Sequence, residues 1–199
     1  YLHDCNPAVE IVNDWLAPDG WIGKEKCNLN AFGMEIFRNI APVSPEKALE
    51  AIERAANSDD GSRFTSRENT HYYEFVRLLR HLAYDPELFD RSVKLICRYA
   101  LSEKPEENRN STRDILTSLF YIHLSGTHAS VEARAKVIEE LVDSEEEVKQ
   151  ELGLILLDAA LETWHFSSSG EFEFGARTRD FGYEPRTHKD IAHWYETYI

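Results

Sequence analysis

Cysteine is scarce in this sequence, and its scarcity excludes two common kinds of small-protein architecture. The chain has three, Cys5, Cys27 and Cys97, an odd number with no two close together. A zinc site of the CxxC type needs closely spaced thiolates, and a disulfide framework needs several pairs. Glycine and proline are also few, with 9 and 7 among 199 residues, so the composition is that of a globular chain rather than a linker.

Positive charge and long apolar runs are lacking as well. The chain has 22 Lys and Arg against 36 Asp and Glu, a net charge of −14. Nucleic acids and anionic membranes attract positively charged surfaces, so neither is an expected partner. No stretch of about 18 apolar residues could cross a bilayer, and no signal peptide is recognisable. We therefore predict a cytoplasmic protein that does not associate with membranes.

The sequence also has none of the motifs that mark the large enzyme families. It lacks the GxxxxGK[ST] phosphate loop, a GxGxxG after a strand, HExxH and GxSxG. The triplet Asp180-Phe181-Gly182 matches the DFG motif of protein kinases, but no HRD loop, glycine-rich loop or lysine-bearing strand accompanies it. We predict that the chain is not an enzyme and has no catalytic residues, no cofactor and no metal ion.

What the sequence does contain is a series of strong helix signals. Ser44-Pro45-Glu46 and Asp85-Pro86-Glu87 each supply an N-cap residue, a proline at the first helical position and an acid in the first turn. Two earlier helices are predicted over residues 7–16 and 34–40. Further helix starts are predicted at Thr65 or Ser66, Ser111, Ser130 and Ser144.

Two of these helices carry more detailed predictions. The helix from Ser111 should run as far as Ser125-Gly126. The helix from Ser144, where Ser144 and Glu147 match a capping box, should extend to about Thr163. Its apolar residues lie on two faces, which predicts a position between neighbouring helices. Those residues are Val148, Leu152, Ile155, Leu156 and Ala159 on one face and Leu154, Leu157 and Leu161 on the other.

The overall pattern predicts an all-α protein, because no segment alternates polar and apolar residues as a strand would. We expect about 60% helix or more. Alternate helix starts lie roughly 40 residues apart, which is the period of HEAT-like repeats. This predicts antiparallel helical hairpins stacked as a HEAT-like α-solenoid, with a closed helical bundle as the alternative.

The chain divides into three predicted regions. Residues 1–43 are irregular and partly helical, 44–163 hold the helical hairpins, and 164–199 hold a crossover loop and a C-terminal helix. The chain begins at Tyr1 rather than Met and stops at Ile199 inside a predicted helix, which indicates a fragment of a larger protein.

Acidic residues crowd one predicted turn between helices. In one interpretation they form a solvated corner with no further role. In the other they attract a basic partner. The residues are Glu139, Glu140, Asp143, Glu145, Glu146 and Glu147.

Residues 164–187 differ from the helices before them because they are rich in aromatics, too rich for a disordered linker. We predict an ordered, mostly non-helical crossover in which these rings are buried. Pro185 disfavours helix just before it, and Thr187 with Asp190 predicts the N-cap of the next helix. The aromatic residues are Trp164, Phe166, Phe172, Phe174, Phe181 and Tyr183.

Four basic residues follow in the same stretch, Arg177, Arg179, Arg186 and Lys189. In one interpretation the arginines lock the loop by pairing with Asp180 and nearby carboxylates, and we expect Asp180 to pair with at least one of them. In the other the planar guanidinium groups remain free to bind a phosphate or carboxylate.

Four segments together resemble the helical region that follows the nucleotide-binding domain in large bacterial ATP-binding proteins of the STAND type, some of which act in defence against phage. The segments are "GMEIFRNIAPVSPEKALEAIERA", "LLRHLAYDPELFDRSVKLICRYA", "RDILTSLFYIHLSGTHAS" and "FEFGARTRDFGYEPRT", within residues 33–187. The resemblance implies sensing, autoinhibition or assembly. It does not carry over ATPase chemistry, since the chain has no Walker motif.

The sequence therefore predicts a non-catalytic helical-repeat scaffold or sensor module of a larger bacterial protein. Its expected partners are other domains of that protein or a separate protein. The alternative is a module that contacts an anion or nucleotide through Arg177, Arg179, Arg186 and Lys189.

Overall fold

The computed structural model describes residues 2–104, 111–164 and 173–199. In these ranges the chain has 62% helix and no strand, which confirms the predicted all-α class. Its helices are α1 (Asn6–Leu16), α2 (Ala31–Ile40), α3 (Pro45–Ala56), α4 (Gly61–Phe64), α5 (Tyr72–Leu82), α6 (Pro86–Ser102), α7 (Thr112–Thr117), α8 (Val131–Val142), α9 (Glu147–Leu161) and α10 (His188–Tyr198).

Most helices begin where the capping residues predict. The Asp85 side chain accepts a hydrogen bond from the Glu87 N–H at 3.1 Å and so caps α6. Ser111 and Ser130 cap α7 and α8 in the same way. Thr187 and Asp190 form a complete capping box at the start of α10. These caps are confirmed because each depends only on residues within one turn.

The predicted helix start at Thr65 or Ser66 is wrong. The chain forms the short helix α4 over Gly61–Phe64, then turns, and α5 begins only at Tyr72. Asn69 holds the turn, since its side chain donates to the Phe64 carbonyl and accepts from the His71 N–H, both at 2.9 Å. Side chains of this kind compete with the helix for backbone hydrogen bonds.

The helix from Ser111 is shorter than predicted. It ends at Thr117 rather than at Ser125-Gly126, although Leu119 and Phe120 beyond its end are fully buried. Leu124 has a φ of 55°, a left-handed conformation that a helix does not accommodate. The apolar pattern therefore predicted burial correctly and conformation incorrectly.

The predicted capping box at Ser144 is also wrong. The Ser144 hydroxyl accepts from the Glu146 N–H at 3.2 Å, which closes a short turn. The N-cap of α9 is Glu146, and α9 begins at Glu147 without a side-chain cap.

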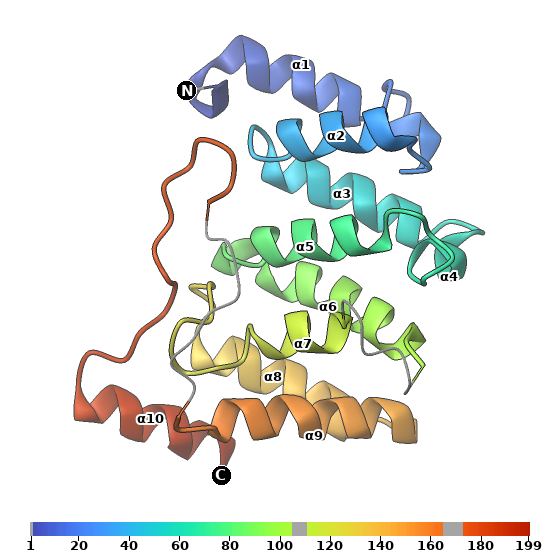
Figure 1. The fold of residues 1–199 in the computed structure, drawn as a ribbon. Coiled ribbons are helices and arrows are strands. Elements are labelled where there is room, and N and C mark those ends of the chain that lie inside the picture. Colours follow the sequence, from blue (N-terminus) through green and yellow to red (C-terminus); the bar gives the residue numbers. More distant parts are fainter. Residues whose placement is uncertain (1, 105–110, 165–172) are drawn as a thin grey trace.

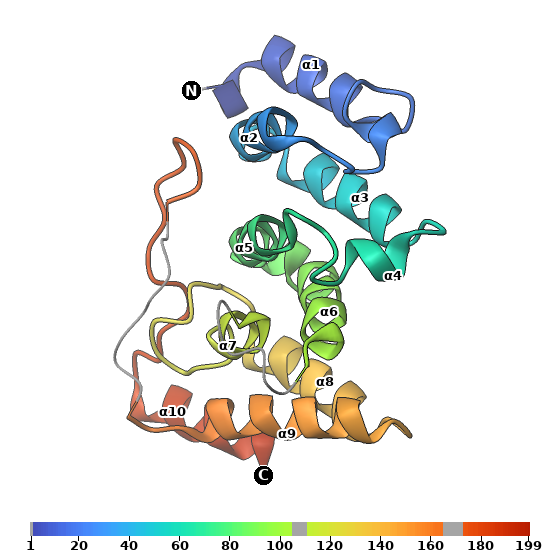
Figure 2. The same cartoon turned by 45° about the vertical axis from the view of Figure 1, so that its right-hand side comes forward.

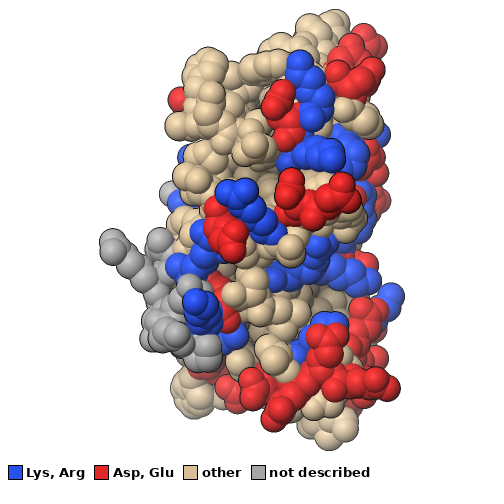
Figure 3. All heavy atoms as spheres, turned by 90° about the vertical axis from the view of Figure 1, so that its right-hand side faces the viewer, with Lys and Arg blue, Asp and Glu red and all other residues tan. Residues whose placement is uncertain are grey.

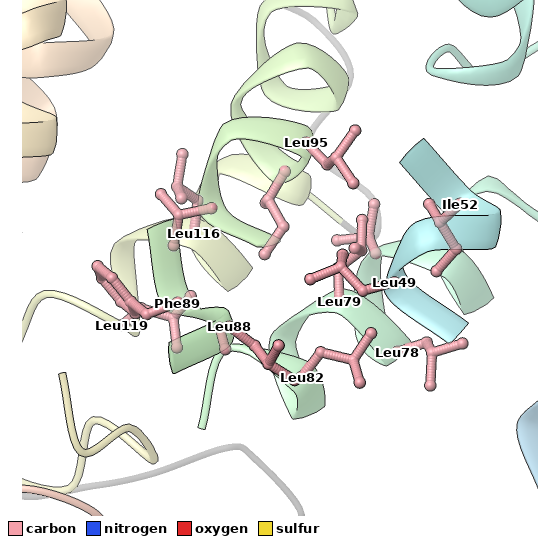
Figure 4. Packing of buried hydrophobic residues seen from close by; sticks show 14 of the residues in the cluster. Leu49, Ile52, Leu78, Leu79, Leu82, Leu88, Phe89, Leu95, Leu116 and Leu119 are labelled. Carbon is pink, nitrogen blue, oxygen red and sulfur yellow. The ribbon is translucent and has the colours of Figure 1, made fainter. Parts of the chain in front are cut away.

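The helices lie in sequence order from α1 at one end of the molecule to α9 and α10 at the other (Figures 1 and 2). The helix pairs in contact include α3 and α6, α5 and α6, and α8 and α9, and α10 packs on both α8 and α9. One hydrophobic cluster runs from Val12 to Trp194 and so passes through all three predicted regions. Figure 4 shows part of it, with Leu49 of α3, Leu79 of α5 and Leu116 of α7 turned into the spaces between helices.

Within the described ranges, no helix combines the length and the apolar character that crossing a membrane requires.

Candidate functional site

Residues 173–187, which we call the returning segment, run along one side of the helices and end at α10 (Figures 1 and 2). The segment contacts three connections between helices. These are the connection from α2 to α3 at Pro42, the one from α5 to α6 at Tyr84, and the one from α7 to α8 at Thr127. The predicted non-helical crossover is thus confirmed for residues 173–187, while residues 165–172 lie outside the described residues.

The first attachment is at Pro42. Gly175 has a φ of +61°, and a Cβ at this position would lie 2.7 Å from the Pro42 Cβ. Arg177 donates from Nε to the Pro42 carbonyl at 2.8 Å. This close approach requires glycine at position 175. The contact with Pro42 places the Arg177 side chain just beyond the C-terminus of α2.

The second attachment is the guanidinium of Arg179. It lies between the rings of Tyr84 and Phe174, 4.3 Å and 4.4 Å from their centroids, and donates to the His81 carbonyl at 2.6 Å. The cation therefore lies at the C-terminal turn of α5, where the helix dipole is negative. Burial lowers the pKa of Arg179 to about 10, a value at which the group remains charged at neutral pH.

The third attachment is backbone to backbone. The Gly126 N–H donates to the Phe181 carbonyl at 2.9 Å, and the Tyr183 N–H donates to the Thr127 carbonyl at 2.7 Å. Gly182, between the two, has a φ of +87° and leaves no room for a Cβ. Thr127 is in turn fixed by its own hydroxyl, which donates to the Ala83 carbonyl at 2.5 Å.

Asp180 does not pair with an arginine in the described structure, so that prediction is wrong. Its carboxylate accepts from the Tyr84 hydroxyl at 2.9 Å and lies 2.8 Å from His128 Nε2. Burial alone would raise the pKa of Asp180, but hydrogen bonds from the Gly182 N–H, Tyr84 and His128 outweigh it and lower the pKa. Neighbouring residues of an extended chain point to opposite sides, which separates Asp180 from Arg179.

Tyr84, His128 and Asp180 form a cluster of mutually hydrogen-bonded side chains. His128 Nε2 is within 3.1 Å of the Tyr84 hydroxyl and within 2.8 Å of Asp180, so one ring nitrogen faces both groups. All three side chains are thereby engaged with one another. Asp180, the first residue of the DFG triplet, thus belongs to this cluster. Among the described residues no group of three or more His, Cys, Asp or Glu side chains is arranged to hold a metal ion.

The four predicted basic residues do not form one site. Arg177 and Arg179 line a groove of ≈ 620 Å³ together with Tyr84 and Asp85. Arg186 instead lines a separate hollow of ≈ 420 Å³, where Asp180, Glu184 and Asp190 also lie. Lys189 is exposed on α10. The sequence placed these residues within one stretch, and the path of the returning segment separates them.

The predicted burial of the aromatic residues holds only in part. Phe174 is 4% exposed and Tyr183 stacks on Trp194 with ring centroids 5.7 Å apart. Trp164 and Phe181 are 82% and 52% exposed, so for them the prediction is wrong. Phe166 and Phe172 lie outside the described residues. Phe181 contacts the loop before α8 through its backbone carbonyl.

Sequence reasoning missed Arg134, which is fully buried. Its guanidinium donates to the Tyr121 and Thr127 carbonyls at 3.0 Å and 3.3 Å, and to the Ser125 hydroxyl at 3.2 Å. It also lies 5.0 Å from the Trp194 ring centroid. Burial lowers its pKa to about 10. The sequence did contain a signal for this burial. Arg134 lies on the apolar stripe of α8, where a charged side chain is buried only if it has partners.

A second candidate feature is the outer face of α9. The prediction that α9 lies between neighbouring helices holds only in part, because α9 packs on α6, α7, α8 and α10 and buries Leu152, Leu156 and Ala159, but leaves other apolar side chains exposed. The outer face exposes Val148 by 50%, Leu154 by 56%, Ile155 by 42% and Leu161 by 37%.

Acidic residues share this outer face of α9. Glu147, Glu151, Asp158 and Glu162 are exposed along it, and no Lys or Arg of the described ranges forms a salt bridge with any of them. Figure 3 shows acidic side chains gathered at the end of the molecule where α8 and α9 lie. The face therefore combines exposed apolar surface with unneutralised negative charge.

The described residues thus present two features that could bind another molecule, the groove beside the returning segment and the outer face of α9. No family model, curated protein or solved structure matches this chain.

Proposed function

We propose that the chain is a non-catalytic helical scaffold, and that the outer face of α9 binds a basic amphipathic helix of a protein partner or of another domain. The observation that carries the proposal is the pairing of exposed leucine, isoleucine and valine side chains with unneutralised carboxylates on one helix face. Soluble proteins seldom leave contiguous apolar surface uncovered without using it for binding.

The spacing along α9 fits a helical partner. Val148 and Ile155 are seven residues apart and form one apolar edge, and Leu154 and Leu161, also seven apart, form the other. Glu151 lies between these edges, since residues three and four positions apart share a helix face. A partner helix would place its apolar residues along the edges and its Lys or Arg residues over the carboxylates.

We also propose that the helices form a HEAT-like α-solenoid rather than a closed bundle. A solenoid has two open ends, and the opposite end of the molecule also leaves apolar side chains exposed. On α1, α2 and the connection between them these are Ile11, Trp15, Trp21 and Phe32, at 51%, 38%, 47% and 67% exposure. The order of the helices along the molecule supports the same arrangement.

The resemblance to STAND-type proteins favours an interdomain partner within a larger protein. In such a setting the α9 face would bind a basic helix of a neighbouring domain and so contribute to sensing or assembly. The acidic turn before α9, from Glu139 to Glu147, would attract the same partner at longer range.

The proposal is tested with a designed amphipathic helix of about 18 residues, made of leucine and lysine, whose length matches one face of α9. We expect saturable binding by fluorescence anisotropy. Replacing Leu154 and Ile155 together with aspartate should weaken it at least about tenfold, which corresponds to about 1.4 kcal/mol. Both side chains are exposed, so the fold should be unaffected.

Three controls make this experiment specific. The variant Ile11→Asp carries the same kind of change at the opposite end and should bind as the unaltered protein does. A peptide of the same composition in scrambled order should bind at least tenfold more weakly if an amphipathic face is recognised. Equal binding of the ordered and scrambled peptides, or equal losses in the α9 and Ile11 variants, would reject the proposal.

A further inference from the structure

The groove beside the returning segment has room for more than a single ion, at ≈ 620 Å³. Its walls include the first residue of α3, Pro45, the start of α6 at Asp85 and Pro86, and the returning segment at residues 176–179, and His3 and His128 also line it. Leu88 and Ala176 add apolar surface. The volume of the groove falls within the range of small-molecule sites.

Arg177 is the principal polar group of the groove. Its Nε donates a hydrogen bond to the Pro42 carbonyl. No described residue accepts a hydrogen bond from its two terminal nitrogens. The hydrogen bond to Pro42 fixes the plane of the guanidinium. The remaining edge is the one that binds two oxygens of a phosphate or carboxylate at once.

The surroundings of Arg177 favour an anion although the whole protein is acidic. Arg179 lies on the same wall, and Asp85 is the one carboxylate among the described lining residues. That carboxylate is already engaged with the Glu87 N–H at the start of α6. The carboxylate of Asp180 is likewise engaged, since it accepts from the Tyr84 hydroxyl and faces His128 Nε2, and both of these residues line the groove.

The N-terminus of α3 also borders the groove. Pro45 lines the groove, and no side chain caps the helix there, because the Ser44 hydroxyl donates to Asn13 Oδ1 at 2.6 Å instead. The start of α3 therefore has no side-chain cap, and Glu46 is the acid in its first turn.

We infer that this groove binds a phosphorylated small molecule. The phosphate accepts hydrogen bonds from the two terminal nitrogens of Arg177 and lies toward the uncapped start of α3. The Thr178 hydroxyl, on the same wall, is a further donor. The organic part of the ligand lies against Leu88 and Ala176. This site is separate from the α9 face and does not depend on the proposed scaffold function.

The inference is tested by calorimetric titration of the full chain with inorganic pyrophosphate, adenosine 5′-monophosphate and adenosine at constant ionic strength. We expect saturable one-to-one binding of the two phosphate compounds and none of adenosine. Arg177→Gln should weaken binding at least about tenfold, since a hydrogen bond to a charged group contributes about 1.5–3 kcal/mol. Glutamine retains an N–H donor for the Pro42 carbonyl, which preserves the attachment of the segment.

Arg186→Gln is the matched control, because Arg186 belongs to the same stretch but lines the other hollow. Its affinity for the phosphate compounds should lie within about twofold of that of the unaltered chain. This is a change in binding free energy of less than half of the roughly 1.4 kcal/mol that a tenfold change represents. Thr178→Val alters the groove but leaves the hydrogen bond from Arg177 to the Pro42 carbonyl in place. It should weaken binding of the phosphate compounds severalfold. Absence of saturable binding at millimolar concentration, or equal losses in the Arg177 and Arg186 variants, would overturn the inference. Binding of pyrophosphate without adenosine 5′-monophosphate would do so as well, since it would show an ion site too small for an organic phosphate.

Discussion

Gly182 lies so close to Thr127 that a Cβ on the glycine would stand 2.5 Å from both the backbone nitrogen and the backbone oxygen of Thr127. This approach lets Phe181 and Tyr183 on either side form their hydrogen bonds with the connection between α7 and α8. The attachment of the returning segment therefore depends on a residue without a side chain.

Gly182→Ala should destabilise this attachment. The alanine would need a φ near +87° and would collide with backbone atoms that cannot rotate away, and we expect a loss of about 2 kcal/mol or more. Urea denaturation measures the stability, and limited proteolysis within residues 173–187 measures the release of the segment. Gly33→Ala is the control, since its nearest contacts are side chains at 3.3–3.4 Å and alanine favours helix. Equal stability of the two variants would contradict this account of Gly182.

Phe174→Ala should cost about 3 kcal/mol, because the ring is 4% exposed and its removal leaves a cavity beside His81 and Arg179. Phe181→Ala should cost less than about 1 kcal/mol, since that ring is half exposed. The free energy of unfolding in urea compares the two. A larger loss for Phe181 than for Phe174 would mean that the segment packs on the helices in another way.

The stability of the protein should fall between pH 7 and pH 5 in part because of His81. Burial and the neighbouring arginines lower its pKa from 6.5 to about 4, so the unfolded chain takes up the proton first. The contribution of the neutral ring is present above pH 6.5 and is lost as the pH falls toward 4. We expect a loss of about 1–2 kcal/mol by pH 5.

His81→Gln isolates this effect, because it removes the titrating group. The difference in unfolding free energy between pH 7 and pH 5 should be smaller in the variant than in the unaltered chain. An unchanged pH dependence would show that His81 does not titrate as described.

Replacing Arg134 should destabilise the loop between α7 and α8. Arg134→Met removes the donors for the Tyr121 and Thr127 carbonyls and the Ser125 hydroxyl, and we expect a loss of about 3 kcal/mol. Lys136→Met, on the exposed side of the same helix, should change the stability by less than about 0.5 kcal/mol. Thermal denaturation followed by circular dichroism distinguishes the two, and similar midpoints would refute a structural role for the buried arginine.

The folded chain should not depend on a metal ion and should not hydrolyse ATP. We expect EDTA to leave the far-ultraviolet circular dichroism spectrum unchanged, because the core is built from apolar side chains. Loss of helicity on adding the chelator would count against this prediction. ATP turnover that a single His or Glu substitution abolishes would count against it equally.

The sequence by itself determined the helical class and most helix starts. A capping residue such as Asp85 or Thr187 satisfies backbone N–H groups within its own turn, so its effect can be read from neighbouring letters. The presence of an ordered non-helical segment before α10 was predictable for the same reason, from Pro185 and the density of aromatic residues.

Only the tertiary structure decided how far each helix runs and what the charged side chains contact. The helix from Ser111 stops early and Arg134 lies in the core because the loop after α7 supplies carbonyl acceptors to that arginine. Asp180 faces His128, 52 residues away in the chain, rather than the adjacent Arg179. Such pairings depend on which segments pack side by side, and no local pattern encodes that.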